Sequence, residues 1–95
     1  MNGKKPNKQE QKWIDAIIDY GCCVCQQNGV FSPAELHHIN GGSNHLESLP
    51  LCFFHHRQGG NTDEYVSRHP WLSEFEDRYG NEVDILANLQ AKLGF

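Results

Sequence analysis

Apolar residues recur at helical spacing near the start of the chain. Asn7, with Glu10 three residues later, is suited to cap a helix there, and Gly21 ends the pattern. The apolar positions, which we expect to face the core, are Trp13, Ile14, Ile17 and Ile18. The sequence therefore predicts a first helix directly after a short arm, residues 1–6.

The last third of the chain predicts two more helices, a support that spans about residues 69–94. Pro70 is suited to the first turn of one helix, and Gly80 ends it. The other helix begins near Asn81 and ends near Gly94. Their apolar positions are Trp71, Leu72, Phe75 and Tyr79 in the first helix, and Val83, Ile85, Leu86, Leu89 and Leu93 in the second.

Between these helices the hydrophobic pattern is short and often broken. Residues 22–34 have the composition of turns, a strand is expected over 35–39, and 40–44 form a loop. Residues 46–51 either return as a strand or form an irregular turn around Pro50. A short helix over 53–58 follows. We therefore predict an α+β fold with a hairpin and helix at its centre, in one domain that spans residues 7–95.

Four cysteines and six histidines change this picture, because a 95-residue chain with a mean hydropathy of −0.64 has a thin core. Cys22-x-x-Cys25 and Cys52-x-x-His55 have the spacing of two chelating pairs for one tetrahedral zinc ion. Two disulfides are the alternative, which the lack of a signal sequence disfavours. Cys23 is the spare thiol, suited to a buried position. We predict a structural zinc knuckle.

The other five histidines need a separate explanation. On a strand, His37 and His38 point to opposite faces and cannot both bind one ion without a bulge or turn. Adjacent on a short helix, His55 and His56 diverge in the same way, so one can face the zinc knuckle and the other a second site.

Three segments of the chain resemble the motif of HNH endonucleases, which have a ββα-metal (His-Me finger) fold: residues 36–39, 41–44 and 49–56 (LHHI, GGSN and LPLCFFHH). This match covers about residues 21–60. A wider pattern, comprising HHRQGG at 55–60, His69, and FEDRYGNE at 75–82, is similar to the phage recombination-enhancement (Ref-type) nucleases. Members of that group depend on RecA filaments.

The resemblance implies a role for several residues. His38 matches the general base that deprotonates the attacking water, and a pKa near 6.5 suits this task. His37 and His56 match the ligands of one catalytic divalent cation, with Mg²⁺ or Mn²⁺ expected. His69 either completes the metal shell, contacts DNA, or only starts a helix.

The residue at the middle position of the motif differs from the one that is usual in the family. Ser48 stands where Asn is usual, and its hydroxyl is expected to orient the ring of His38, with Asn44 as the substitute candidate. His45 is expected on a solvated loop, with contact to a substrate phosphate as the alternative.

The net charge of −4 is unfavourable for a DNA-binding protein. Positive charge is concentrated at the start, since residues 1–12 carry a local balance of +3. The arm is either a solvated tail or a contact to phosphate through Lys4, Lys5 and Lys8. Arg57, next to His56, either pairs with a phosphate near the cut or lies on a solvated helix face.

These features favour a metal-dependent DNA endonuclease that hydrolyses phosphodiester bonds in recombination or DNA processing. We expect it to be phage- or prophage-encoded, cytoplasmic in a bacterial host and without a membrane span. An enzyme that is inert until a partner such as a RecA filament delivers DNA fits the acidic body. The alternative is a non-catalytic zinc-stapled module that binds nucleic acid or protein.

Overall fold

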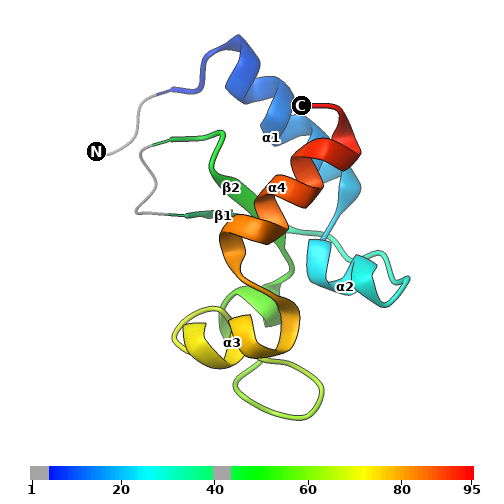
Figure 1. Cartoon of the computed structure of the whole chain (residues 1–95), viewed down its shortest axis with the longest axis vertical. Helices are drawn as coiled ribbons and strands as arrows, with labels where there is room; N and C mark the ends of the chain where they lie inside the picture. The colour runs from blue at the N-terminus through cyan, green and yellow to red at the C-terminus, as the bar shows by residue number, and fades with distance from the viewer. Residues whose placement is uncertain (1–4, 40–43) are drawn as a thin grey trace.

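The computed structural model describes residues 5–39 and 44–95. The elements are, in chain order, α1 (Lys8–Tyr20), α2 (Cys23–Gln27), β1 (Glu35–His38), β2 (Ser48–Leu51), the π-helix η2 (Phe54–Gln58), α3 (Leu72–Tyr79) and α4 (Glu82–Leu93). The hairpin lies behind α4, with α1 at one end of the molecule and α3 at the other (Figure 1). The expected α+β class, with an N-terminal helix, a β-hairpin and two C-terminal helices, is confirmed, and the short helix α2 is an addition.

Helix α1 begins and ends where the sequence predicts. The Asn7 side chain accepts a hydrogen bond from the backbone N–H of Glu10, and the Glu10 carboxylate accepts one from the N–H of Asn7. Of the four expected core positions, Trp13 and Ile17 are fully buried, whereas Ile18 is 41% exposed. The buried face of α1 is therefore narrower than the apolar stripe suggested.

The two strands form an antiparallel hairpin in which Glu35 pairs with Leu51 and His38 with Ser48. The return-strand alternative for residues 46–51 is thus the correct one, over Ser48–Leu51. All four β2 residues are buried, because α1, α2 and η2 contact this strand. The indole N–H of Trp13 donates to the Ser48 carbonyl over 3.2 Å, which fixes α1 against the hairpin.

Three expectations were wrong in detail. Residues 22–34 are not all turn, because Cys22 starts α2 by accepting hydrogen bonds from Cys25 and Gln26. Pro70 precedes α3, whose first helical hydrogen bond runs from Phe75 N–H to the Trp71 carbonyl. Val83 is 60% exposed, whereas Ile85 and Leu89 are buried and share their face of α4 with the buried Glu82.

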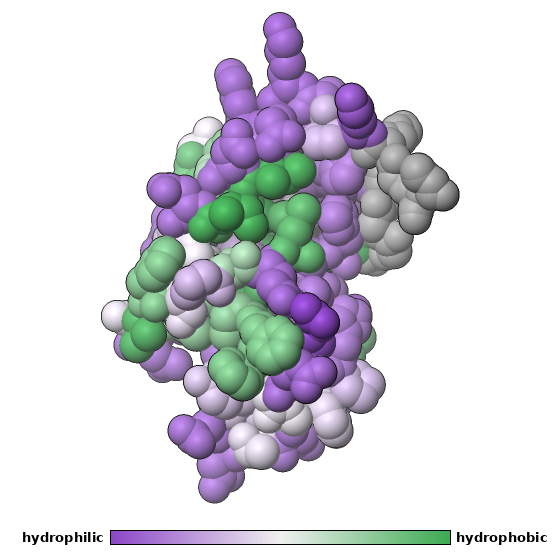
Figure 2. Space-filling view, turned by 180° about the vertical axis from the view of Figure 1, so that it is seen from behind, coloured by the Kyte–Doolittle hydropathy of each residue, from purple (hydrophilic) through white to green (hydrophobic). Residues whose placement is uncertain are grey.

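The reverse side of the molecule carries an apolar area that hydrophilic side chains surround (Figure 2). Large apolar side chains that remain exposed include Phe31, Phe53 and Phe54. Within residues 5–39 and 44–95, no helix has the length and hydrophobicity required to cross a membrane.

Candidate metal centres and active site

Four buried side chains from the ends of three elements converge on one point. Cys22 and Cys25 come from the start and the body of α2, Cys52 follows β2, and His55 lies in η2. The His55 Nδ1 atom lies 3.6, 3.5 and 3.2 Å from the Sγ atoms of Cys22, Cys25 and Cys52. The Sγ atoms of Cys25 and Cys52 are 3.9 Å apart. The structure thus brings together the four residues of the predicted zinc knuckle.

These distances fit a tetrahedral zinc ion. With Zn–S bonds of about 2.3 Å and Zn–N bonds of about 2.0 Å, neighbouring ligand atoms lie roughly 3.5 to 3.8 Å apart. Burial raises the pKa of the Cys22 and Cys52 thiols and lowers the pKa of His55 to about 4. A neutral imidazole is ready to bind metal, and the buried thiols need a cation to ionise. The cluster is therefore suited to a structural metal such as zinc.

Cys23 lies outside this cluster, although it is only 7% exposed. Burial raises the pKa of its thiol to about 12. It therefore occupies a buried position as a small apolar side chain, next to a cluster whose four positions are already filled.

Three further histidines form a second cluster. His37 comes from β1, His56 from η2, and His69 from the segment before α3. Their ring centroids are each 5.2 Å apart, and one nitrogen of each ring lies within 4.8 Å of the others. His37 is buried, His56 is half-buried and His69 is exposed. The cluster is thus closed on the strand side and open to solvent on the other.

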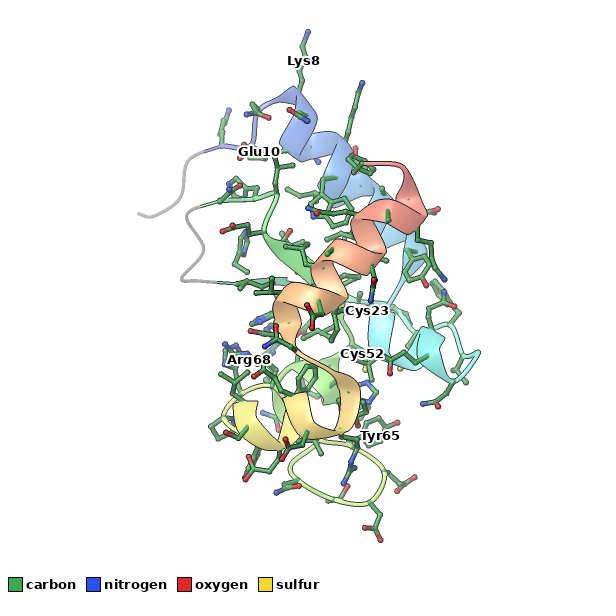
Figure 3. The ribbon with its side chains drawn as sticks, in the orientation of Figure 1. Lys8, Glu10, Cys23, Cys52, Tyr65 and Arg68 are labelled. Carbon is green, nitrogen blue, oxygen red and sulfur yellow. The ribbon has the colours of Figure 1, made fainter. Side chains whose placement is uncertain are left out.

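Two carboxylates hold rings of this cluster. Glu82, at the start of α4, accepts a 2.6 Å contact from His37 Nε2 and a 2.7 Å hydrogen bond from Arg68 Nε. Burial by itself raises the pKa of Glu82, but these hydrogen bonds outweigh it and lower the pKa below its ordinary value. Arg68, beside the histidine cluster, and Cys52, of the cysteine cluster, lie on different sides of the lower end of α4 in Figure 3.

Glu35 plays the same part for the second ring. Its Oε1 atom lies 2.8 Å from His56 Nδ1, and Arg57 donates two hydrogen bonds to the same carboxylate. Hydrogen bonds from Arg57 and then from His56 lower the pKa of Glu35 to about 2. Because Nδ1 of His56 is occupied, its Nε2 atom is left to face the cluster. Metal-binding histidines commonly have a carboxylate on the other nitrogen.

His38 lies on the other side of the strand from His37, as the alternation of side chains predicts. Its Nε2 atom is 3.0 Å from Nδ1 of His45. Burial, and then the charges of His45 and His37, lower the pKa of His38, so its ring is neutral at physiological pH. Ser48 pairs with His38 in the hairpin, but its hydroxyl donates to the His45 carbonyl over 2.7 Å. The Asn44 side chain accepts from Leu46 N–H over 2.9 Å.

The expected DNA-contacting residues are dispersed. Lys5 and Lys8 are exposed near the start of α1, and Lys4 lies outside the described residues. Residues 40–43, of the expected loop and motif, also lie outside them. Arg57 is exposed but bound to Glu35, and its guanidinium lies 5.1 Å from the centre of the Phe53 ring.

Sequence reasoning missed two residues of this region, Glu82 and Glu35, and did not foresee the contact between His45 and His38. Glu82 lies 45 positions from His37, and an acidic residue in the first turn of a helix is common without any site. Glu35 is one of several acids on short polar segments. For His45, composition gave the only hint: it is one of six histidines and lies close to His38 in the sequence.

This small α+β domain thus carries two groups of side chains that could each hold a metal ion, a closed cysteine–histidine cluster and an open histidine cluster. The model of the family described as recombination enhancement, RecA-dependent nuclease matches residues 6–93, and the chain belongs to this family. It is therefore a nuclease, that is, a phosphodiester hydrolase, with DNA as its substrate, a role in recombination and a link to RecA. No curated protein sequence matches the chain.

Proposed function

We propose that the chain is a metal-dependent DNA endonuclease of the HNH, ββα-metal type. The observation that carries this proposal is the meeting of His37, His56 and His69 on one side of β1, with His38 on the other. Strands β1 and β2 and helix η2 supply the hairpin and helix of that fold, and the Cys₃His cluster braces them. A non-catalytic binding module does not require three convergent imidazoles next to a fourth.

Each histidine has a distinct task in this mechanism. His38 accepts a proton from a water molecule as its oxygen attacks phosphorus and the bond to the 3′-oxygen breaks. His37, His56 and His69 would hold one divalent cation, with Mg²⁺ or Mn²⁺ expected from the family resemblance, although imidazole ligands by themselves suit Zn²⁺ and Ni²⁺ better. When bound, this cation stabilises negative charge on the scissile phosphate and the leaving 3′-oxygen. Burial, and then the charge of Arg68, lower the pKa of His69, which keeps its ring neutral and able to bind metal.

Delivery of DNA by a RecA filament fits the distribution of charge. The chain has only three arginines, and each engages an acceptor of the protein itself: Arg57 binds Glu35, Arg68 binds Glu82 and Arg78 binds backbone carbonyls. The acidic body therefore offers few free cations to phosphate. Three lysines at the start of the chain, Lys4, Lys5 and Lys8, supply the remaining attraction.

The test is cleavage of plasmid and single-stranded DNA by the zinc-loaded protein with Mg²⁺ or Mn²⁺, with and without RecA filaments. We expect His38→Ala to lower the cleavage rate by about 100-fold or more, because a general base contributes roughly 10²–10⁴-fold. Glu74→Gln, on the exposed face of α3, is the matched control and should cleave like the wild type.

Melting curves and zinc content must first show that His38→Ala is folded. Equal cleavage by wild type and folded His38→Ala contradicts the assignment of the base. A wild type that cuts neither DNA, with or without filaments, overturns the proposed mechanism as a whole.

A further inference from the structure

His38 is held by another histidine rather than by the side chain at the middle position of the motif. The Nε2 atom of His38 lies 3.0 Å from Nδ1 of His45, and the two ring centroids are 5.1 Å apart. We propose that His45 is the positioning residue of the general base. This inference rests on the function proposed above and adds a residue whose role the sequence left open.

The backbone around His45 is fixed by several hydrogen bonds. The buried Ser48 hydroxyl donates to the His45 carbonyl over 2.7 Å, and Asn44 caps the N–H of Leu46. The Glu47 carbonyl accepts a hydrogen bond from Ile39 N–H, directly after β1, over 2.8 Å. Ser48 and Asn44 therefore act on the base indirectly, since they hold the backbone that carries the His45 ring.

The direction of this hydrogen bond decides which tautomer His38 adopts. A hydrogen bond between Nε2 of His38 and Nδ1 of His45 needs one donor and one acceptor. If His38 Nε2–H donates, the lone pair of His38 Nδ1 is free to take the proton from water, and His45 carries its own proton on Nε2. The opposite arrangement places a proton on Nδ1 of neutral His38 and blocks the base. The positioning role of His45 therefore requires that His45 accepts this hydrogen bond from His38.

The same contact also stabilises His38 after it has taken the proton from water. Protonated His38 donates from Nε2 with a full positive charge, and charge-assisted hydrogen bonds are roughly twice as strong as neutral ones. His45 therefore favours the state of His38 in which the attacking water has already lost its proton. In this proposal His45 orients the His38 ring, which is the task expected of the Ser48 hydroxyl from the sequence.

The experiment compares His45→Ala and His45→Asn with the wild type in the cleavage assay, all loaded with zinc. Asn places an oxygen at the same number of bonds from the backbone as Nδ1, so it can accept the hydrogen bond from His38. We expect kcat to fall by about 10- to 100-fold in His45→Ala with KM for DNA unchanged, the usual loss for a supporting group. His45→Asn should restore most of this loss.

Glu47→Ala, which changes a neighbouring side chain of the same turn, is the control and should cleave like the wild type. A second readout does not depend on activity. The ring N–H of His38 should give a slowly exchanging proton signal by NMR in the wild type and in His45→Asn, but not in His45→Ala. The affinity for Mn²⁺ should be the same in all of them, because His45 lies outside the three-histidine cluster.

Failure of this inference is distinct from failure of the proposed function. If His38→Ala abolishes cleavage while folded His45→Ala cleaves at the wild-type rate, only the role of His45 is overturned. A lower Mn²⁺ affinity in His45→Ala, or a KM effect without a kcat effect, also contradicts a positioning role. If the wild type never cleaves, the proposed function itself fails.

Discussion

At the scale of single residues, Glu82 links the three-histidine cluster to the rest of the fold. It is 5% exposed, yet it carries a charge because His37 and Arg68 both bind its Oε2 atom. A buried carboxylate in this position fixes which nitrogen of His37 faces the cluster and increases the basicity of that nitrogen. The first residue of α4 thus contacts the three-histidine cluster although it lies 45 positions after His37 in the sequence.

Glu82→Gln should therefore weaken metal binding at the catalytic site proposed for the three-histidine cluster. Gln has the same size but lacks the charge, and loss of such a supporting group typically costs about 10- to 100-fold in metal affinity. Titration of the zinc-loaded protein with Mn²⁺ by calorimetry measures the effect. Glu74→Gln, an exposed change of the same chemistry on α3, should leave the affinity unchanged. Equal affinities in folded Glu82→Gln and wild type would show that His37 needs no carboxylate.

The sequence predicted histidines that could meet, but not their supports. Strand and helix geometry predicted that His37 and His38, adjacent in the chain, face different sides, and the family resemblance implied that His37 and His56 meet. Glu82 could not, because its contact with His37 spans 45 positions and depends on how α4 packs. The partner of His38 was also not predicted, since the hydrogen bond to His45 depends on the path of a turn, which composition alone does not define.

At the scale of elements, one glycine sets the angle between α1 and the first two cysteines of the cysteine–histidine cluster. Gly21 has φ of +86°, and a Cβ atom built on it would lie 2.7 Å from the Phe31 ring and 2.8 Å from the Ser32 carbonyl. That carbonyl accepts the hydrogen bond from Cys22 N–H. The close approach brings the segment after α2 back against the start of the cluster.

Gly21→Ala should destabilise the domain through both strain and a steric clash. Gly29→Ala is the matched control, because its φ is +73° but a Cβ there meets nothing within 4 Å. The control carries only the backbone cost of a positive φ, about 1–2 kcal/mol. Gly21→Ala should lose about 1 to 3 kcal/mol more, because of the clash and because its ψ of −174° at this φ is essentially confined to glycine. Urea unfolding followed by circular dichroism gives both values. Equal losses would mean that Phe31 and Ser32 move away freely.

The boundaries of α1 and α4 could be predicted because local signals fix them. Asn7 and Asn81 cap the two helices through their own side chains, and Gly94 ends α4 in the left-handed conformation. The start of α3 could not be predicted as well, since Pro70 and Trp71 fit either a first turn or a lead-in segment. Their tertiary contacts, including the hydrogen bond from Trp71 N–H to the Ser67 carbonyl, decide between the two.

At the scale of the whole molecule, the cysteine–histidine cluster joins parts of the chain that lie far apart in the sequence. Cys22 and His55 lie 33 positions apart, and the ligands come from α2, the end of β2 and η2. The apolar core around Trp13 and Phe75 is small. In a domain of this size, the free energy of metal binding is largely free energy of folding. His56 directly follows His55 in η2, so we expect the three-histidine cluster to depend on an intact cysteine–histidine cluster.

Removal of zinc should therefore unfold the domain. Apparent binding free energies of structural zinc are about 10–16 kcal/mol, which equals or exceeds the usual stability of a domain, about 5–15 kcal/mol. Cys25→Ser removes one ligand and should lose both the zinc and the cooperative melting transition. Cys23→Ser, two positions away but outside the cluster, should keep one equivalent of zinc and melt within a few degrees of the wild type. Metal content by mass spectrometry and thermal melting by circular dichroism test both variants, and a zinc-free Cys25→Ser protein that melts like the wild type would contradict a structural role for the metal.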